Sequence, residues 1–417
     1  MRVALVVPVF PQPSETFIVN KAIGLLDRGI DVRIVCSSSP EATWSGYGSD
    51  HRVHEMRARV EVSPSAALHP DAVLGSLRQV AGLARAPRGS LKRYLAHDGG
   101  PTVRRVRDLV IDAPLVSIEP DLVHFEFGSL APGRMALRHR LPCAVAVSFR
   151  GYDLNHVALD DPDHYRDLWE NADGIHVLGD ALWRSALHRG APPETPHTVI
   201  TPAIDTSSIT ATPTRPGELG VPHKPLRLLS IGRLHWTKGY EYALDAVAAL
   251  RDAGLKVTYR IVGDGELLAA VAFWRHQLDL TDSVELLRAV PPAEVVRQLE
   301  WADIVLHAAT TEGFCNAVIE AQASGVPVVC ADSGGLPENV EHGVTGIVVP
   351  RRDPRALADA VIDLAADGDK RARMGAAGRE RVERLFRLDD QIDAWVDFYE
   401  RAVDRRRQPA GRSAATG

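Results

Sequence analysis

Glu312 and Glu320 are two carboxylates eight residues apart, and they bound the segment of this chain whose residue types best suit ligand binding. Glu312 follows an apolar strand, and Glu320 is expected on the helix that the intervening loop opens. A helix rises about 1.5 Å per residue, so the loop and first turns span roughly 10 Å. A helix start carries free N–H donors and a positive dipole end. The backbone amides of Phe314, Cys315 and Asn316 would therefore face an anion between the two carboxylates. Carboxylates accept hydrogen bonds from sugar hydroxyls, so the segment suits a nucleotide sugar.

Glutamates at this spacing are also common on solvated helix faces, so the context decides. Here the context is a strand, a loop with Gly313, a helix, then Gly325-Val-Pro327 and a second strand. This segment resembles the Glu-x7-Glu motif of the retaining glycosyltransferases of family four, which have the GT-B fold. The likeness continues through residues 331–338 and 343–350.

Two cations follow the first strand of the second half, in the stretch from Ser230 to Gly239. Gly232 allows a sharp turn, Arg233 can grip phosphate oxygens with two N–H groups, and Lys238 supplies a point charge. Two such cations alone are more often surface charge. The family resemblance implies that they form a diphosphate clamp, which would stabilise the leaving group without a metal.

The resemblance also implies the remaining donor contacts. Glu320 would hold the ribose hydroxyls, Glu312 the hydroxyls of the transferred sugar, and the turn at Gly263 would form a wall of the nucleotide pocket. A dinucleotide-binding loop would need a third glycine where Leu268 stands. Cys315 is either a small packing residue or a reactive thiol at a helix start. The predicted donor site therefore comprises Gly232, Arg233, Lys238, Gly263, Gly313, Phe314, Cys315, Asn316 and Glu320.

In the first half, Arg150 ends a strand at the position where many relatives carry a histidine that contacts the transferred sugar. Arg150 could bind phosphate or an anionic sugar, or it could pair with Asp153; the residues leave both open. His124 also ends a strand, where a packing role is commoner, although Glu126 nearby keeps a site role open. The opening Ser14-Glu15-Thr16 resembles that of some exopolysaccharide glycosyltransferases, and it could equally cap a helix. Arg150 joins Arg233, Lys238 and Glu312 as catalytic candidates, and the acceptor-side candidates are Ser14, Glu15, Thr16, His124 and Asp153.

Apolar strands alternate with amphipathic helices, which predicts an α/β fold with parallel sheets. We expect the GT-B form, two doubly wound Rossmann-like domains facing each other across a cleft. The expected domains are an acceptor domain at 1–202, a linker at 203–225, a nucleotide-sugar domain at 226–387, a helix crossing back at 388–407 and a disordered tail at 408–417. The expected strands are Val3–Pro8, Val32–Val35, Leu122–Phe125, Ala144–Ser148, Ile175–Leu178, Val199–Ile200, Leu226–Ile231, Thr258–Val262, Val284–Leu287, Ile304–Leu306, Val326–Cys330 and Gly346–Val349.

Length, net charge and cysteine content limit the number of domains and the kinds of partner. A chain of 417 residues is too long for one ordinary hydrophobic core, so two domains are expected. The net charge of -6 argues against general binding of nucleic acid. The four cysteines lack close pairing or metal spacing, which predicts reduced thiols in the cytoplasm and no metal. Residues 78–107 are strongly basic, and could contact an anionic membrane or form a solvated helical hairpin.

The sequence therefore predicts a cytoplasmic, metal-independent glycosyltransferase with no cofactor besides its nucleoside-diphosphate sugar substrate. As the resemblance implies, it would retain anomeric configuration by front-face attack of an acceptor, either a lipid-linked glycan or a small natural product. The alternatives are a nucleotide-sugar epimerase or hydrolase of the same fold, a non-catalytic sugar-binding module and, more remotely, a nicotinamide dehydrogenase. A non-catalytic module would be expected to lack one of Arg233, Lys238, Glu312 and Glu320, and all four are present.

Overall fold

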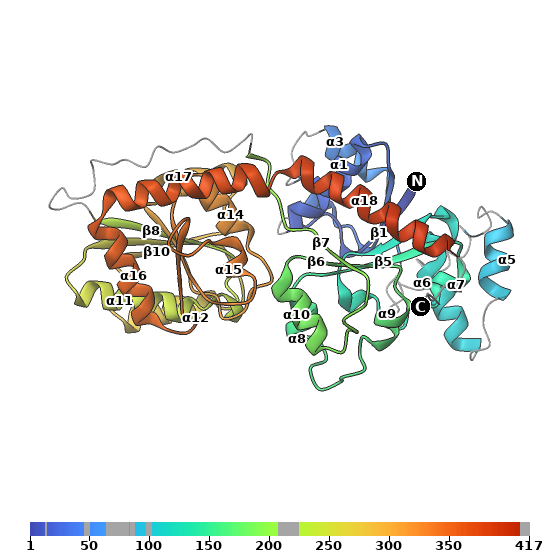
Figure 1. Ribbon diagram of the computed structural model, residues 1–417, viewed down its shortest axis with the longest axis horizontal. Coiled ribbons are helices and arrows are strands. Elements are labelled where there is room, and N and C mark those ends of the chain that lie inside the picture. Colours follow the sequence, from blue (N-terminus) through green and yellow to red (C-terminus); the bar gives the residue numbers. More distant parts are fainter. Residues whose placement is uncertain are drawn as a thin grey trace, which may run out of the picture. The chain divides into compact units, whose positions relative to one another are not determined.

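A computed structural model describes residues 1–12, 15–45, 51–63, 83, 88–96, 102–206 and 225–408 of the chain (Figure 1). They divide into two compact units. The first unit comprises Met1–Val177, Trp183–Ile200 and the chain from Ile392 onward, and the second comprises Leu178–Leu182 and Thr201–Gln391. Most of the expected linker and nearly all of the expected tail lie outside the described residues.

The first unit is built on a seven-stranded sheet of order β3-β2-β1-β4-β5-β6-β7, in which every neighbouring pair is parallel. Parallel neighbours need crossover connections, which the intervening helices supply. The strands are β1 Arg2–Val9, β2 Asp31–Ser38, β3 Val60–Val62, β4 Leu122–Phe125, β5 Ala144–Phe149, β6 Gly174–Val177 and β7 His197–Val199. The sequence prediction missed β3, which is only three residues long and half exposed.

The helices of the first unit are mostly short. They are α1 Thr16–Asp27, α2 Glu41–Ser45, α3 His51–Arg57, α5 Arg88–Ala96, α6 Thr102–Ile118, α7 Leu137–Arg140, α8 Tyr152–His156, α9 Arg166–Asn171, α10 Asp180–His188 and the final helix α18 Leu388–Arg407.

The second unit has a six-stranded parallel sheet of order β10-β9-β8-β11-β12-β13. The strands are β8 Leu226–Ile231, β9 Val257–Val262, β10 Val284–Arg288, β11 Ile304–His307, β12 Val328–Ala331 and β13 Gly346–Val349. Strand β12 begins two residues later than predicted, because Pro327 has no N–H for the ladder. The helices are α11 Tyr240–Asp252, α12 Leu268–Gln277, α13 Pro292–Trp301, α14 Asn316–Ala323, α15 Leu336–Asn339, α16 Pro354–Ala366 and α17 Gly368–Leu385.

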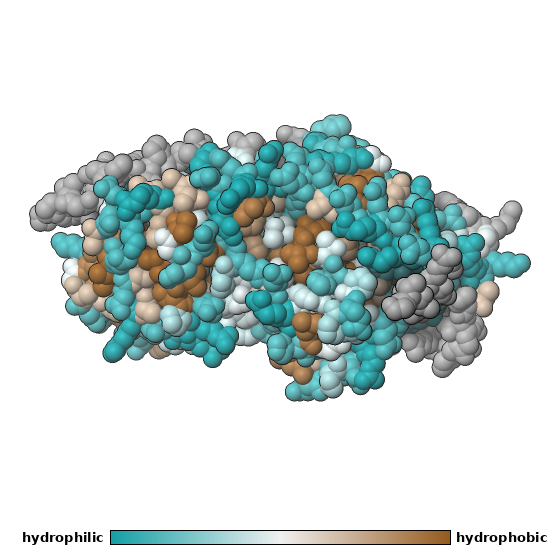
Figure 2. All heavy atoms as spheres, viewed as in Figure 1, coloured by the Kyte–Doolittle hydropathy of each residue, from teal (hydrophilic) through white to brown (hydrophobic). Residues whose placement is uncertain are grey.

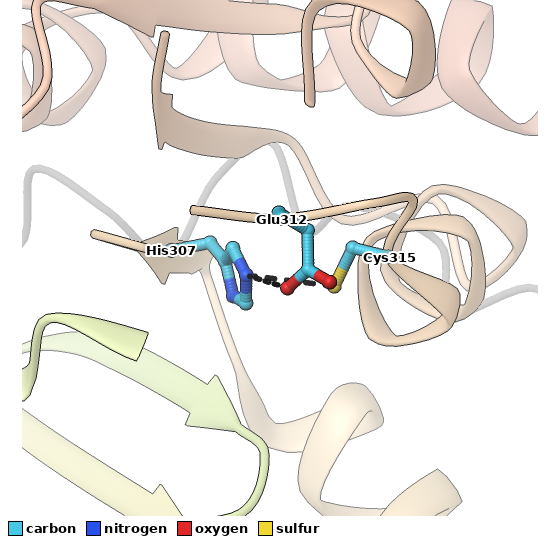
Figure 3. A group of neighbouring side chains, drawn as sticks. All are labelled: His307, Glu312 and Cys315. Carbon is cyan, nitrogen blue, oxygen red and sulfur yellow. Dashed lines mark hydrogen bonds and ion pairs between the residues drawn. The ribbon is translucent and has the colours of Figure 1, made fainter. Parts of the chain in front are cut away.

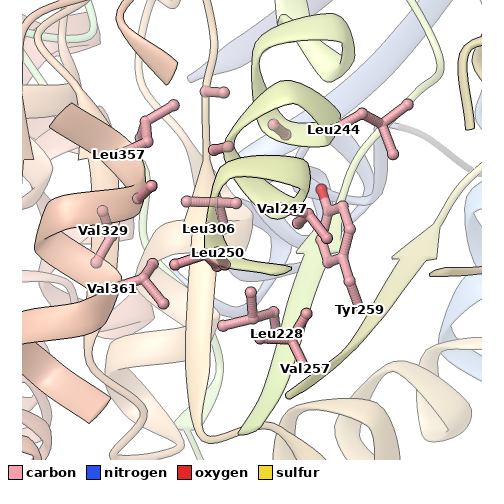
Figure 4. Close-up of a cluster of buried hydrophobic side chains, with 14 of the residues drawn as sticks. Leu228, Leu244, Val247, Leu250, Val257, Tyr259, Leu306, Val329, Leu357 and Val361 are labelled. Atoms are coloured by element: carbon pink, nitrogen blue, oxygen red, sulfur yellow. The ribbon is translucent and has the colours of Figure 1, made fainter. Parts of the chain in front are cut away.

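Both faces of this second sheet are buried, which explains its continuous apolar strands. Leu228 of β8 and Leu306 of β11 belong to a core cluster with residues of α11 and α16 (Figure 4). Their neighbours Leu229 and Val305 belong to the opposite core, with residues of α14. Successive side chains of a strand point to opposite faces, so each strand contributes to both cores.

Polar residues are buried at the centre of the first unit, in a group that we call the Lys21 network: Lys21, His124, Glu126, Ser148, His176 and Tyr399. The Lys21 ammonium lies 2.6 Å from Glu126 Oε1 and 3.1 Å from His124 Nδ1. It also lies 3.2 Å from the centroid of the Trp395 ring, a cation–π contact. Imidazole Nε2 of His124 and Nδ1 of His176 each lie 2.8 Å from Ser148 Oγ.

The network joins α18 to the sheet of the first unit. Tyr399 of α18 places its hydroxyl 2.8 Å from His124 Nδ1. Ile392, Trp395, Phe398 and Tyr399 recur at helical spacing on α18 and are buried. Gly24 of α1 lies so close to Ile392 that a Cβ would be 2.6 Å from its side chain.

Burial disfavours the charged forms of both Lys21 and Glu126, and the neighbouring charges counteract this effect. Burial lowers the pKa of Lys21 to about 7, although Glu126 counteracts it. Burial would also raise the pKa of Glu126, but Lys21, His124 and Arg150 outweigh it and hold that pKa well below its usual range. The Glu126 carboxylate is therefore the anion that holds the surrounding cations.

Among the described residues, no helix combines the length and apolar character needed to cross a bilayer. The face drawn in Figure 2 is mainly hydrophilic, with apolar residues scattered among the polar ones.

We predict that Glu126→Gln lowers the free energy of unfolding by about 3–5 kcal/mol, because it leaves buried cations without their counter-charge. The control Asp393→Asn, which breaks the exposed Arg28–Asp393 pair between α1 and α18, should cost about 1 kcal/mol or less. Urea unfolding at neutral pH measures both, and equal losses would contradict the prediction.

The difference between wild type and Glu126→Gln should also depend on pH. The folded pKa of Glu126 lies below its ordinary value of 4.5, so its stabilisation is present above that pH and is lost as the pH falls toward the folded pKa. The two proteins should therefore converge in stability below about pH 4.5. A difference that stays constant down to acid unfolding would refute this origin of the stabilisation.

Candidate active site

The predicted donor residues of the second unit gather at one edge of its sheet. Gly232 follows β8, Gly263 follows β9, and the loop to Cys315 follows β11. Strand β8 lies between β9 and β11, and all three are parallel, so these turns leave from the same edge. The carboxyl ends of parallel strands are where open α/β sheets bind ligands.

Two glycines allow the backbone of these turns to pack directly together. Gly263 has φ +150°, and a Cβ there would lie 1.9 Å from the carbonyl oxygen of Gly232. Gly334, with φ +57°, brings the loop after β12 equally close to the carbonyl oxygen of Glu312. The next residue, Gly335, donates its N–H to that carbonyl at 3.0 Å. The loop that carries Glu312 is therefore packed directly against the backbone of the loop after β12.

Lys238 and Glu312 form an ion pair with each other, and both side chains are largely buried. Burial alone would raise the pKa of Glu312, but Lys238 and then His307 outweigh it and lower that pKa to about 2. Burial alone would lower the pKa of Lys238, but the attraction and hydrogen bond of Glu312 together with Cys315 outweigh it and raise that pKa. The sequence prediction gave these residues separate roles, whereas the structure brings them together. The carboxylate is thus ionised and already holds the cation expected to meet the phosphates.

His307 is a site residue that the sequence prediction missed. It ends β11, and its Nε2 lies 3.4 Å from Glu312 Oε2 and 3.5 Å from Cys315 Sγ (Figure 3). Burial disfavours the imidazolium, but Cys315 and Glu312 outweigh it and raise the pKa of His307 to about 9. The available signal was a histidine ending an apolar strand five residues before Glu312.

Arg233 and Glu320 differ from this buried group because they make no side-chain hydrogen bond or ion pair within the described ranges. Arg233 is exposed, at the turn after β8. Glu320 lies on α14, and burial raises its pKa. One cationic and one acidic group thus remain available to a ligand on the unit that carries Lys238.

The start of α14 is only partly open to an anion, which corrects the prediction for Cys315. Its N–H donates to Asn339 Oδ1 at 3.0 Å, and Asn339 Nδ2 donates back to the Cys315 carbonyl at 3.3 Å. Asn339 is fully buried, so it closes this amide to a ligand. In the described part of the chain no bond engages the amides of Phe314 and Asn316, which follow Gly313 in the loop.

Comparison with known proteins identifies the family of this chain. Residues 212–381 match the family model described as "Glycosyl transferases group 1". A "GDP-mannose-dependent alpha-(1-6)-phosphatidylinositol monomannoside mannosyltransferase" of Mycobacterium tuberculosis is 31% identical over 318 residues, covering 72% of this chain and 80% of the relative. The chain belongs to the group 1 glycosyltransferases. This confirms the family resemblance drawn from the Glu-x7-Glu segment.

Two further likenesses extend over nearly the whole glycosyltransferase. A "Putative colanic acid biosynthesis glycosyltransferase WcaL" of Escherichia coli is 27% identical, covering 93% of this chain and 96% of the relative. The solved structure of Anabaena HepE in complex with UDP and glucose has a TM-score of 0.71 at 18% identity, covering 95% of this chain and 98% of that one. The predicted GT-B class, with its two parallel-sheet α/β units, is confirmed.

In the first unit of the glycosyltransferase, the Arg150 side chain pairs with Glu126 and not with Asp153, whose pairing was one of the two possibilities that the sequence left open. The Arg150 guanidinium also lies 4.3 Å from the Phe17 ring. Asp153 instead accepts the backbone N–H groups of Arg150 at 3.0 Å and of Ser129 at 2.9 Å. Asp153 is buried and ties two loops, so the structure gives it a structural contact rather than an open acceptor site.

The structure describes three of the other acceptor-side candidates, His124, Glu15 and Thr16. His124 is fully buried within the Lys21 network, and burial holds its pKa well below the usual range, so it stays neutral. Ser14 lies outside the described residues. Glu15 is the N-cap residue of α1 and its side chain makes no capping hydrogen bond, while Thr16 is the first residue of the helix.

We predict that Gly334→Ala destabilises the glycosyltransferase by about 1–3 kcal/mol more than Gly254→Ala, because its methyl group collides with the Glu312 carbonyl. Both glycines have positive φ, so the two variants share the conformational cost of about 1–2 kcal/mol. Gly254 has no atom within 4 Å of its added Cβ, which makes it the matched control. Urea unfolding of both variants is the measurement, and equal losses would show that the loop accommodates the methyl group.

Proposed function

We propose that this glycosyltransferase moves a sugar from a nucleoside-diphosphate sugar to a growing surface polysaccharide, with retention of anomeric configuration and without a metal. The observation that carries the proposal is the group at the carboxyl edge of the second sheet. There a buried Lys238–Glu312 pair and the exposed Arg233 share one unit with Glu320.

The charges of this group match a nucleoside diphosphate and its sugar. Arg233 and Lys238 would bind the two phosphates, since guanidinium and ammonium groups form charge-assisted hydrogen bonds with phosphate oxygens. Glu312 would accept hydrogen bonds from the transferred sugar, and Glu320 from the ribose. Gly232 and Gly263 would let the nucleotide approach the backbone closely.

The same group suits front-face transfer. The bond from the anomeric carbon to the diphosphate breaks, while the acceptor oxygen bonds to that carbon from the same face. The departing phosphate oxygen takes the acceptor proton, so no protein base is required. Arg233 and Lys238 stabilise the charge that grows on the diphosphate, and cations already in place do so with little reorganisation.

Relatives support the choice of polymer and donor. WcaL is named for colanic acid biosynthesis, HepE was solved with UDP, and the mycobacterial relative is named as GDP-mannose-dependent.

The acceptor that we propose is a lipid-linked surface glycan at the cytoplasmic side. The basic segment 78–107 is our candidate for contact with anionic lipid there; only part of it is described, including Lys92 and Arg93 of α5.

The first test is nucleotide binding by thermal shift with UDP, GDP, ADP, TDP and CDP in the presence of a chelator. A shift with one diphosphate would support a metal-free pocket and identify the donor base. A melting temperature unchanged by all five would reject the proposal. Product analysis with the corresponding sugar donor then separates transfer from release of a free or epimerised sugar.

We predict that Arg233→Ala weakens binding of the preferred diphosphate by about 10- to 100-fold, the loss expected for hydrogen bonds to a charged group. Arg297→Ala is the control, because Arg297 is an exposed arginine of the same unit that pairs with Glu294 on α13. Isothermal titration calorimetry gives both affinities. Unfolding temperatures should stay close to wild type, and equal affinities of the two variants would remove Arg233 from the clamp.

A further inference from the structure

His307, Glu312 and Cys315 point toward one another from three adjacent segments (Figure 3). His307 ends β11, Glu312 lies in the following loop, and Cys315 is the N-cap of α14. One ligand atom of each lies within 4.8 Å of those of the other two. The proposed transfer reaction uses Glu312 but requires neither the imidazole nor the thiol.

The three donor atoms are the kinds that zinc selects. Zinc binds imidazole nitrogen, thiolate sulfur and carboxylate oxygen, whereas magnesium and calcium take oxygen ligands. Sets of three protein ligands leave a fourth position for water or another group. The thiol thus favours a borderline-soft ion over the hard ions that accompany nucleotides in other enzymes.

The spacing fits a tetrahedral ion on two of its three edges. With Zn–N, Zn–O and Zn–S lengths of about 2.05, 2.1 and 2.3 Å, tetrahedral geometry separates nitrogen from sulfur by about 3.6 Å and nitrogen from oxygen by about 3.4 Å. The observed separations are 3.5 Å for His307 Nε2 to Cys315 Sγ and 3.4 Å for His307 Nε2 to Glu312 Oε2. The third edge is at most 4.8 Å, which a rotation of the carboxylate can shorten.

The surroundings support two of the ligands. The backbone N–H of Cys315 is held by Asn339 Oδ1, and Asn339 is buried, so the cysteine backbone is fixed. His307 continues β11, and its register partner is Cys330 of β12. The hydrogen bond from Asn339 and the strand pairing of β11 with β12 thus fix the backbone that carries these two ligands.

We propose that His307, Glu312 and Cys315 bind a zinc ion, and that this ion blocks the donor site. Lys238 bonds the same Glu312 oxygen that faces His307, so the zinc ion must displace the ammonium or share that carboxylate with it. Binding sends the thiol proton, and the imidazole Nε2 proton where present, to solvent. Glu312 and Lys238 would then be withdrawn from the sugar and the diphosphate. The blocking step rests on the proposed function, whereas the metal site itself does not.

Cobalt is the probe for the site, because Co²⁺ takes zinc positions and absorbs light. The full-length protein is titrated with CoCl₂ under reducing conditions. We expect a thiolate-to-cobalt charge-transfer band and the strong visible bands of tetrahedral cobalt, both abolished by excess Zn²⁺. Absence of these bands in wild type would overturn the metal site.

Single substitutions in the same cobalt titration test which side chains are the metal ligands. Cys315→Ser should lose the charge-transfer band, and His307→Gln should weaken cobalt binding. Cys143→Ser, which changes a buried cysteine of the first unit, should behave as wild type. Retention of the band in Cys315→Ser would overturn the assignment. Circular dichroism melting confirms that each variant is folded, and the wild-type spectrum tests the site even where a variant is not.

Blocking is measured as UDP or GDP affinity with and without saturating Zn²⁺, using whichever nucleotide binds in chelator. We expect a weakening of about 5- to 150-fold, the usual range of coupling between two ligands. The same titration in Cys315→Ser corrects for zinc bound by the nucleotide itself. Equal affinities in wild type with and without zinc would overturn the blocking role. Failure of the proposed function appears separately, as absence of nucleotide binding in chelator, and leaves the cobalt spectrum unaffected.

Discussion

The ion pair between Lys238 and Glu312 is the contact on which the arrangement of the candidate site depends. It joins the turn after β8 to the loop after β11, and the N–H of Thr310 reinforces that junction by donating to the Thr237 carbonyl at 2.8 Å. A largely buried pair is costly to form, because both ions lose water. That cost is offset only if both partners are held in position: Gly334 and the buried Asn339 hold the loop of Glu312, and the bond from Thr310 to Thr237 holds the turn beside Lys238. The pair therefore requires a rigid frame around it, and that frame positions Glu312.

The two units treat polar groups at strand ends in opposite ways. In the first unit, His124 lies near the end of β4 and Glu126 directly follows that strand; Trp395 and Tyr399 of α18 pack against His124. Covered polar groups must bond to each other, and the Lys21 network is the result. In the described part of the second unit, no helix supplies a side-chain partner for Arg233, which is exposed. The same position at the end of a parallel strand thus becomes structural in one unit and available to a ligand in the other.

The fold by itself carries little information about chemistry, since two parallel α/β units support many functions. Family membership restricts the reaction to glycosyl transfer. At the candidate site of this chain, His307 and Cys315 place an imidazole and a thiol beside the carboxylate of Glu312. Two different ligands, a nucleotide sugar and a soft metal ion, would therefore compete for the single carboxylate of Glu312.

The sequence by itself determined the parallel α/β class, most strands and the final helix, because these follow from local periodicity and from apolar runs buried on both faces. It also indicated the donor group, because Arg233, Lys238, Glu312 and Glu320 lie at strand ends and helix starts, where parallel topology brings side chains together. Only the tertiary structure decided the partners: Glu312 with Lys238 and His307, Arg150 with Glu126, and the Cys315 amide with Asn339. Such pairs join residues that local periodicity cannot relate. Their formation depends on which loops pack together and on how deeply each charge is buried, because a buried charge without a partner is costly.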